Sequence, residues 1–218
     1  MIYPRWLTWA EKKFGWIAIP NLPLFLVGIQ ALGFVLLAVK GGSNPAVASQ
    51  LASRLVLDPQ AVLNGEIWRL FTFIAIPMSH GFWMIFVLWF LYFVFNSLAM
   101  AWGDFKLTVY FLIAWVGTVL ASLLLNVPVE SFIFIESTFF FALATLIPNR
   151  EILFFLIVPL KVKWIALFSA TLMVLFPLLF SDWAYRVYVM VAFLNYLLFF
   201  GPSYIDFLRM EMRRRKMQ

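Results

Sequence analysis

Long apolar stretches alternate with short polar ones along almost the whole chain of 218 residues. A helix needs about 20 mostly apolar residues to cross the hydrocarbon core of a bilayer, and six stretches approach that requirement. They cover residues 17–39, 82–101, 107–125, 131–147, 164–180 and 185–200. The pattern therefore predicts an all-α membrane protein, a bundle of six transmembrane helices.

The connection between the first two stretches, residues 40–81, is long and becomes more apolar towards its end. We expect this first loop to lie partly in the membrane interface, with Trp68 at headgroup depth. A second apolar segment, residues 152–159, is too short to cross the bilayer and is expected to lie flat in the interface. The segment 1–16 carries no small-residue cleavage site, so the first stretch is interpreted as a retained helix rather than a signal peptide. The predicted organisation is an interfacial segment 1–16, a membrane domain 17–203 and a basic tail 204–218.

The basic residues are distributed unevenly between alternate connections. One side would carry twelve Lys and Arg: Arg5, Lys12, Lys13, Lys106, Arg150, Lys161, Lys163, Arg209, Arg213, Arg214, Arg215 and Lys216. The other would carry four: Lys40, Arg54, Arg69 and Arg186. Because cytoplasmic loops are enriched in Lys and Arg, this asymmetry predicts that both termini are cytoplasmic. The basic tail is then a topology anchor that also meets anionic lipid.

Composition limits the chemistry that this chain can perform. The chain is 65% hydrophobic and only 12% charged, whereas a soluble domain has roughly a quarter of its residues charged, so a soluble enzyme is excluded. The absence of cysteine excludes disulfides, thiolate metal sites and cysteine nucleophiles. His80 is the one histidine, and the carboxylates are scattered, so neither a metal site nor a cofactor is expected. The net charge of +6 lies in topology signals, so lipid and not nucleic acid is the expected partner.

Small residues four apart mark the helix that we expect to be most closely surrounded. The stretch 107–125 has two such rows, Ala114, Thr118 and Ser122 in one and Gly117 and Ala121 in the other. Helices in lipid approach closely where side chains are small, so this stretch is predicted to be buried among the others.

Several motifs together resemble the rhomboid superfamily. They are LNGEIWRLFTF with Trp68 and Arg69, then His80 before a long apolar span, AWGDFKL with Gly103, and PNRE followed by ILFFLIVPLKVKWIALF. The resemblance covers most of the chain from about residue 55 onward. It implies a six-helix rhomboid-like fold, a membrane-embedded first external loop, cytoplasmic termini and a location in the bacterial inner membrane.

Rhomboid proteases are intramembrane serine hydrolases, and the residues of this chain depart from their catalytic pattern. The resemblance places the Gly-x-Ser-Gly window on Ile135, Glu136, Ser137 and Thr138, where both glycines are absent. The sixth-helix histidine window falls within residues 191–195, which contain no histidine. A serine hydroxyl is a poor nucleophile without a base, so the sequence favours a rhomboid-like fold without its chemistry.

Three polar residues inside predicted spans are the candidate site residues: Glu136, Ser137 and Asn195. Glu136 either is partly hydrated near the external interface, or is protonated, or serves as a base for Ser137, although adjacent helix residues point about 100° apart. Ser137 is expected to bond a backbone carbonyl one turn back, and Asn195 to form an interhelical hydrogen bond. Arg69 is expected to bond carbonyls of the first loop, and with Trp68 to hold its shape. His80 is interpreted as an interfacial loop residue.

Three functions remain open at this point. The favoured one is a non-catalytic rhomboid-like pseudoprotease that binds or escorts transmembrane segments of client proteins. The first alternative is an active intramembrane serine protease that uses Ser137 with Glu136 or His80 as an atypical base. The second alternative is a small polytopic transporter, with Gln30, Glu136 and Asn195 as the polar residues of its pathway.

Overall fold

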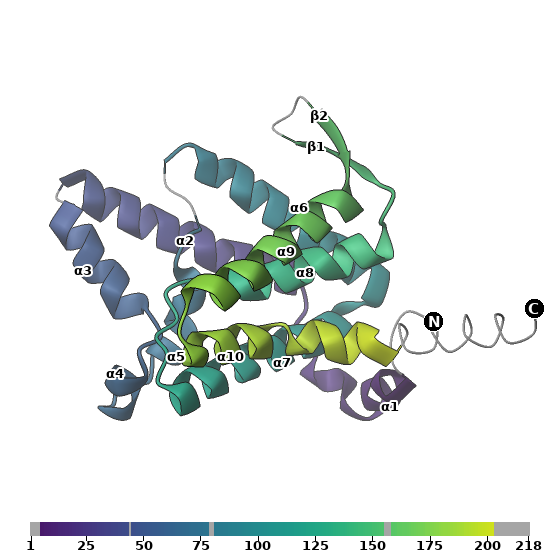
Figure 1. Cartoon of the computed structure of the whole chain (residues 1–218), viewed down its shortest axis with the longest axis horizontal. Helices are drawn as coiled ribbons and strands as arrows, with labels where there is room; N and C mark the ends of the chain where they lie inside the picture. The colour runs from purple at the N-terminus through teal and green to yellow at the C-terminus, as the bar shows by residue number, and fades with distance from the viewer. Residues whose placement is uncertain (1–4, 44, 79–80, 155–157, 203–218) are drawn as a thin grey trace, which may run out of the picture.

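The computed structural model describes residues 5–43, 45–78, 81–154 and 158–202 and is mostly helical (Figure 1). Four of its helices are long and apolar enough to cross a membrane. They are Leu22–Lys40 within α2 (Leu22–Ser43), α6 (Trp83–Trp102), α7 (Asp104–Leu125) and α9 (Val162–Phe180). A fifth candidate is a bent pair, α10 (Trp183–Ala192) and the helix Leu194–Pro202. The chain is therefore an integral membrane protein with several membrane-crossing helices.

The helix α8 (Ile133–Leu146) occupies the predicted fourth span and is shorter than the predicted 131–147. Its 14 residues extend about 21 Å, less than the roughly 30 Å of a hydrocarbon core. Nine of the fourteen are buried, and α8 contacts α6, α7, α9 and α10. By its length α8 does not qualify as a span, but its position is the most interior of the apolar helices.

Two other predicted spans differ from the observed helices. The first begins at Leu22 and not at residue 17, because Pro20 is followed by Asn21 in a left-handed conformation, with φ of 55°. The last is not continuous: its two helices meet at Phe193 with a bend of 46°. The Asn195 side chain accepts a hydrogen bond from the Tyr196 backbone N–H at 2.7 Å, which competes with the helical ladder next to the bend.

The segment expected to lie flat in the interface contributes to two short antiparallel strands. Strand β1 (Glu151–Phe154) pairs with β2 (Val158–Lys161), with Glu151 opposite Lys161. Pairing satisfies the backbone groups of two strands that are each too short to form a membrane helix.

The first loop folds into short helices beyond the end of α2. They are α3 (Pro45–Leu55), α4 (Pro59–Leu63), α5 (Arg69–Thr72) and the 3₁₀ turn η2 (Phe73–Ala75). We refer to these four elements as the first-loop helices. A β-bridge between Leu57 and Val129 fastens them to the α7–α8 connection.

The small residues of α7 fulfil the prediction of close packing. Half of the α7 window is buried, against 28% for α2 and α6 and 17% for α9, so α7 is the most covered of the four spans. The helix α10 packs along α7, and a Cβ on Gly117 would lie 3.6 Å from the Val191 side chain. The small residues of α7 therefore leave space for the bulky side chains of α10 to pack closely against it.

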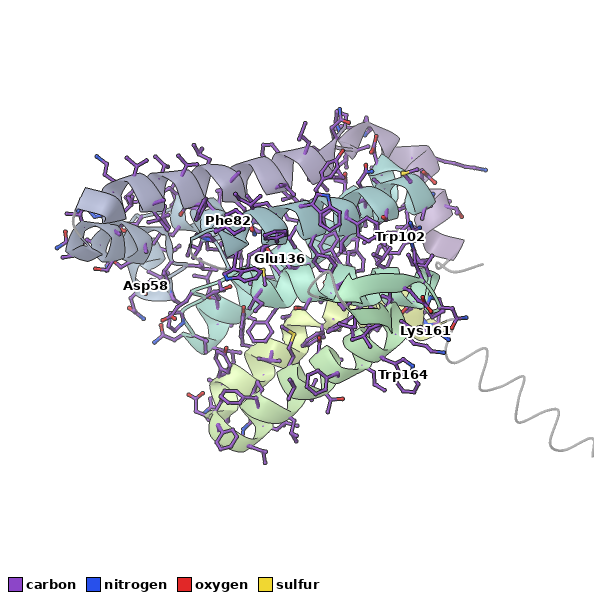
Figure 2. The ribbon with its side chains drawn as sticks, turned by 90° about the horizontal axis from the view of Figure 1, so that it is seen from above. Asp58, Phe82, Trp102, Glu136, Lys161 and Trp164 are labelled. Atoms are coloured by element: carbon purple, nitrogen blue, oxygen red, sulfur yellow. The ribbon has the colours of Figure 1, made fainter. Side chains whose placement is uncertain are left out.

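The polypeptide preceding the first span packs against one end of the bundle. The amphipathic helix α1 (Arg5–Phe14) places Glu11 2.6 Å from the Lys106 ammonium, and the Ile19 N–H donates to the Thr108 hydroxyl at 3.0 Å. Figure 2 shows the two ends of the molecule: Asp58 and Phe82 lie towards one, and Trp102, Lys161 and Trp164 towards the other. Glu136 lies between them.

Candidate functional site

Ser137 lies near the start of α8, where the resemblance places a nucleophile. Its hydroxyl donates to the Ile133 carbonyl at 2.7 Å, one turn back in the same helix. This is the backbone hydrogen bond predicted for it, and among the described residues the hydroxyl has no other polar partner. No base among the described residues is therefore positioned to take its proton.

Glu136, the preceding residue, is directed towards α2. It is 3% exposed, and its Oε1 accepts a hydrogen bond from Nε2 of Gln30. The second carboxyl oxygen of Glu136 and the amide oxygen of Gln30 are both buried without a partner among the described residues. The Gln30–Glu136 pair thus joins α2 to α8 through one hydrogen bond and leaves two buried oxygens without a donor.

Asn195 makes the predicted interhelical hydrogen bond. Its Nδ2 donates to the Thr138 hydroxyl at 2.9 Å, linking the helix Leu194–Pro202 to α8. Thr138 also donates to the Ile135 carbonyl at 2.7 Å, and its own carbonyl accepts from the Tyr110 hydroxyl at 2.9 Å. Asn195 and Thr138 are almost fully buried, so this network fixes the position of α8 between two neighbours.

The three candidate residues do not form a common site. Ser137 bonds its own helix, Glu136 bonds α2, and Asn195 bonds the neighbouring Thr138. None of them lines the cavity of about 470 Å³ that lies at the N-terminal end of α8. The other proposed base, His80, lies outside the described residues. The described geometry contains no catalytic dyad around Ser137.

Arg69 has the loop contacts predicted for it. The guanidinium is largely buried, and its Nη1 donates to the carbonyls of Ser53 at 2.7 Å and Val56 at 2.8 Å, while Nε donates to Glu66 at 2.6 Å. A planar guanidinium can serve several acceptors at once, so one side chain joins the end of α3 to the start of α5. Trp68, in contrast, is half exposed, and its indole N–H has no hydrogen-bond partner among the described residues.

Two further contacts hold the first-loop helices against the bundle. The indole N–H of Trp115 on α7 donates to the Leu70 carbonyl at 2.8 Å, and its ring stacks on Phe71 with centroids 5.0 Å apart. On the other side, α2 approaches η2 so closely that a Cβ on Gly33 would lie 1.8 Å from the Ala75 carbonyl oxygen. The loop is therefore a packed part of the membrane domain.

Gly103 forms the tight turn between α6 and α7. Its φ of 80° lies in the region that favours glycine, and its N–H donates to the Ala99 carbonyl at 2.8 Å. This glycine has a conformational role that the AWGDFKL motif requires, and no part in a site.

Sequence reasoning did not identify the residues around the cavity at the N-terminal end of α8. Glu130 precedes α8, while Asp182 caps α10 and Tyr185 and Tyr188 follow within its first two turns. The available signal was that both carboxylates precede apolar helices, with two tyrosines three residues apart in one of those helices.

The described residues contain no group of three or more His, Cys, Asp or Glu side chains able to hold a metal ion. Comparison of the chain with protein-family models, with curated proteins and with solved structures found no match.

Proposed function

We propose that this chain is a non-catalytic, rhomboid-like membrane protein, a pseudoprotease that binds or escorts transmembrane segments of other proteins. The observation that carries the proposal is the divergence of Ser137 and Glu136 on α8. The hydroxyl at the resemblance-implied nucleophile position bonds its own helix, and the adjacent carboxyl bonds Gln30 on another helix. Nucleophilic catalysis requires a base in contact with the hydroxyl, and the divergence removes the nearest one.

The rhomboid-like part of the proposal requires six passes, which means adding α8 to the four long helices and the bent pair. In Figure 1 the first-loop helices lie at one end of the molecule, and α1 and the β1–β2 hairpin lie towards the other, as alternating passes require. In that arrangement α8 is the fourth pass, and its shortness is tolerated because neighbouring helices cover it. The Lys and Arg asymmetry would then orient both termini to the cytoplasm. The bacterial inner membrane is the location that the resemblance implies.

The exposed surface of α9 supports the client-binding part. Only 17% of its membrane window is buried, and it presents the bulky apolar side chains of Leu167, Phe168, Leu172 and Phe176. A helix with so few internal contacts leaves most of its surface to lipid or to another transmembrane helix. A client segment would gain van der Waals contacts there, which drive helix association in lipid.

Fluorophosphonate labelling tests the absence of catalysis. The detergent-purified full chain should not be labelled, and the Ser137→Ala variant should give the same background. Labelling of the native protein that disappears in Ser137→Ala would overturn the proposal in favour of an active protease.

Site-specific photocrosslinking in membranes tests client binding. A photoreactive residue at Phe168 on α9 should capture a restricted set of membrane proteins, and unlabelled client helix should compete. Met100 on α6 is the matched control, because it too is highly exposed. Equal capture of the same proteins from both positions, without competition, would mean random collision in lipid and would contradict the proposal.

A further inference from the structure

A cavity of about 470 Å³ opens where the α7–α8 connection meets the start of α10. This volume falls within the roughly 300–1,000 Å³ typical of small-molecule sites. Its lining comes from the connection that includes Glu130, the first turn of α8 with Phe134, and the start of α10 from Asp182. The first two of these are continuous in sequence, so two parts of the chain, within residues 125–134 and 182–188, form the cavity.

Three aromatic rings form one wall of this cavity. The centroids of Phe134 and Tyr188 are 5.7 Å apart with the planes at 86°, and those of Tyr185 and Tyr188 are 5.7 Å apart at 46°. Phe134 and Tyr185 are also in edge contact, with centroids 6.2 Å apart. Because the three rings are turned at different angles, the wall that they form contains both ring faces and ring edges. Ring faces attract cations.

Tyr188 has a hydroxyl without a partner inside this wall. The residue is only 2% exposed, and no described residue forms a hydrogen bond with its hydroxyl. The hydroxyl oxygen itself is not fully buried, and Tyr188 lines the cavity, so the hydroxyl can donate or accept a hydrogen bond there. A polar group inside the cavity would satisfy it.

The charges at the cavity are acidic. Glu130 and Asp182 line it, and no lysine or arginine in the described part of the chain does. Glu130 forms no ion pair or hydrogen bond with a described residue, whereas Asp182 caps α10 by accepting from the Tyr185 N–H at 3.2 Å. Arg186, the nearest cation along α10, donates to the Ser181 carbonyl and lines a different depression. The electrostatic field in the cavity therefore favours a cation.

We propose that this cavity binds an organic ammonium group, with the three rings supplying cation–π contacts, Glu130 and Asp182 the opposite charge, and Tyr188 a hydrogen-bonding hydroxyl. Aromatic rings combined with carboxylates are the usual means of binding such cations. A free amine and the headgroup of an ethanolamine or choline lipid carry the same ammonium chemistry. A bare metal ion fits less well, since the described lining offers two carboxylates and no third His, Cys, Asp or Glu side chain.

Choline binding to the full chain in nanodiscs of phosphatidylglycerol, which has no ammonium group, tests the site. Isothermal titration should give saturable binding of choline and none of 3,3-dimethylbutan-1-ol, its uncharged isostere. Glu130→Gln and Glu130→Gln/Asp182→Asn should each weaken choline binding, the double variant by about tenfold. Asn retains the capping ability of Asp182, and Glu130 has no contact to lose, so both variants should fold.

The matched control is Asp104→Asn, which removes an exposed carboxylate that does not line the cavity and should leave choline binding unchanged. Nanodiscs containing phosphatidylethanolamine distinguish the two sources of ammonium. If the lipid headgroup occupies the cavity, the apparent affinity for choline falls as the content of ethanolamine lipid increases. If the site takes a free amine instead, the apparent affinity for choline does not change with lipid content. Absence of saturable choline binding, or equal affinities for the native chain and Glu130→Gln, would overturn the proposal.

Discussion

Gln30 on α2 donates a hydrogen bond from its side-chain amide to Glu136 on α8, across 106 residues of sequence and inside the apolar domain. The pair leaves one oxygen of each side chain buried without a donor. Removing one partner of a buried hydrogen bond costs more than replacing both by apolar groups, because the remaining group loses its only compensation for burial.

We therefore expect Gln30→Leu to lower the free energy of unfolding by about 1–3 kcal/mol, since Glu136 then has no donor. The double variant Gln30→Leu/Glu136→Leu should recover part of this loss, because no buried polar group remains. Chemical unfolding of the detergent-purified variants measures both effects. A double variant no more stable than Gln30→Leu alone would show that the pair is not an isolated buried hydrogen bond.

The two oxygens without a donor lead to a spectroscopic prediction for the same pair. A proton on Glu136 would let its second oxygen donate to the Gln30 amide oxygen and would satisfy both atoms at once. We expect the infrared spectrum at neutral pH to contain a protonated-carboxyl band that is absent from Glu136→Gln. Glu136→Gln should remain stable, because an amide provides the same donor and acceptor. A carboxylate band in place of the protonated one would contradict the prediction.

Arg69 should be the side chain on which the first-loop helices depend most. Arg69→Ala leaves two carbonyls and Glu66 without their donor, and is expected to cost roughly 3 kcal/mol. Arg69→Lys should restore only part of this, because an ammonium lacks the planar fork. Thermal unfolding and limited proteolysis of residues 45–68 measure the loss. Arg54→Ala is the control in the same loop, since Arg54 is exposed and should change stability by about 0.5 kcal/mol or less.

Two glycines of α2 should respond in opposite ways to alanine. Gly33→Ala places a methyl group against the Ala75 carbonyl, which is backbone and cannot rotate away, so a loss of roughly 2 kcal/mol is expected. Gly28→Ala meets nothing within 4 Å and should be neutral or stabilising, because alanine favours a helix over glycine. Comparing their unfolding midpoints tests the close approach of α2 to η2. Equal stability of the two variants would mean that α2 leaves room for a methyl group between Gly33 and the Ala75 carbonyl.

The hydrogen bond between Asn195 and Thr138 should appear as coupling in a double-mutant cycle. Thr138→Val and Asn195→Ala are expected to couple by about 0.6 kcal/mol, the average for buried interhelical hydrogen bonds in a membrane protein. Thr171→Val with Asn195→Ala is the control cycle, because Thr171 is exposed on α9 and bonds its own helix. Coupling of similar size in both cycles would point to a global effect on stability.

The membrane-embedded character and most helix positions could be predicted from the sequence. The C-terminal ends of α6 and α7 lie within one residue of the ends predicted for these two spans. They could be predicted because an apolar run bounded by polar residues is a local property of the sequence. The errors were also local in origin. Asn21 in a left-handed conformation delays the start of α2, and the side chain of Asn195 accompanies the bend beside Phe193.

The candidate site was predictable only in part. The partners of Ser137 and Arg69 lie within a few turns or inside one loop, so residue type and position indicated the kind of hydrogen bond that each makes. The partner of Glu136 could not be predicted, because Gln30 belongs to a distant helix whose rotation the sequence does not specify. The cavity was not identified either, since its lining comes from two stretches, within residues 125–134 and 182–188, that are far apart in the sequence.

The sequence by itself determined that this chain is a membrane protein. A helix in lipid satisfies its backbone N–H and C=O groups internally, so it needs only sufficient apolar length. Tertiary structure alone decided which polar side chains meet. All faces of these helices are apolar, so hydrophobic contrast does not reveal which face is turned inward. Side-chain shape and a few long-range hydrogen bonds make that choice, and they place α8 at the centre, Glu136 against Gln30, and Ser137 away from any base among the described residues.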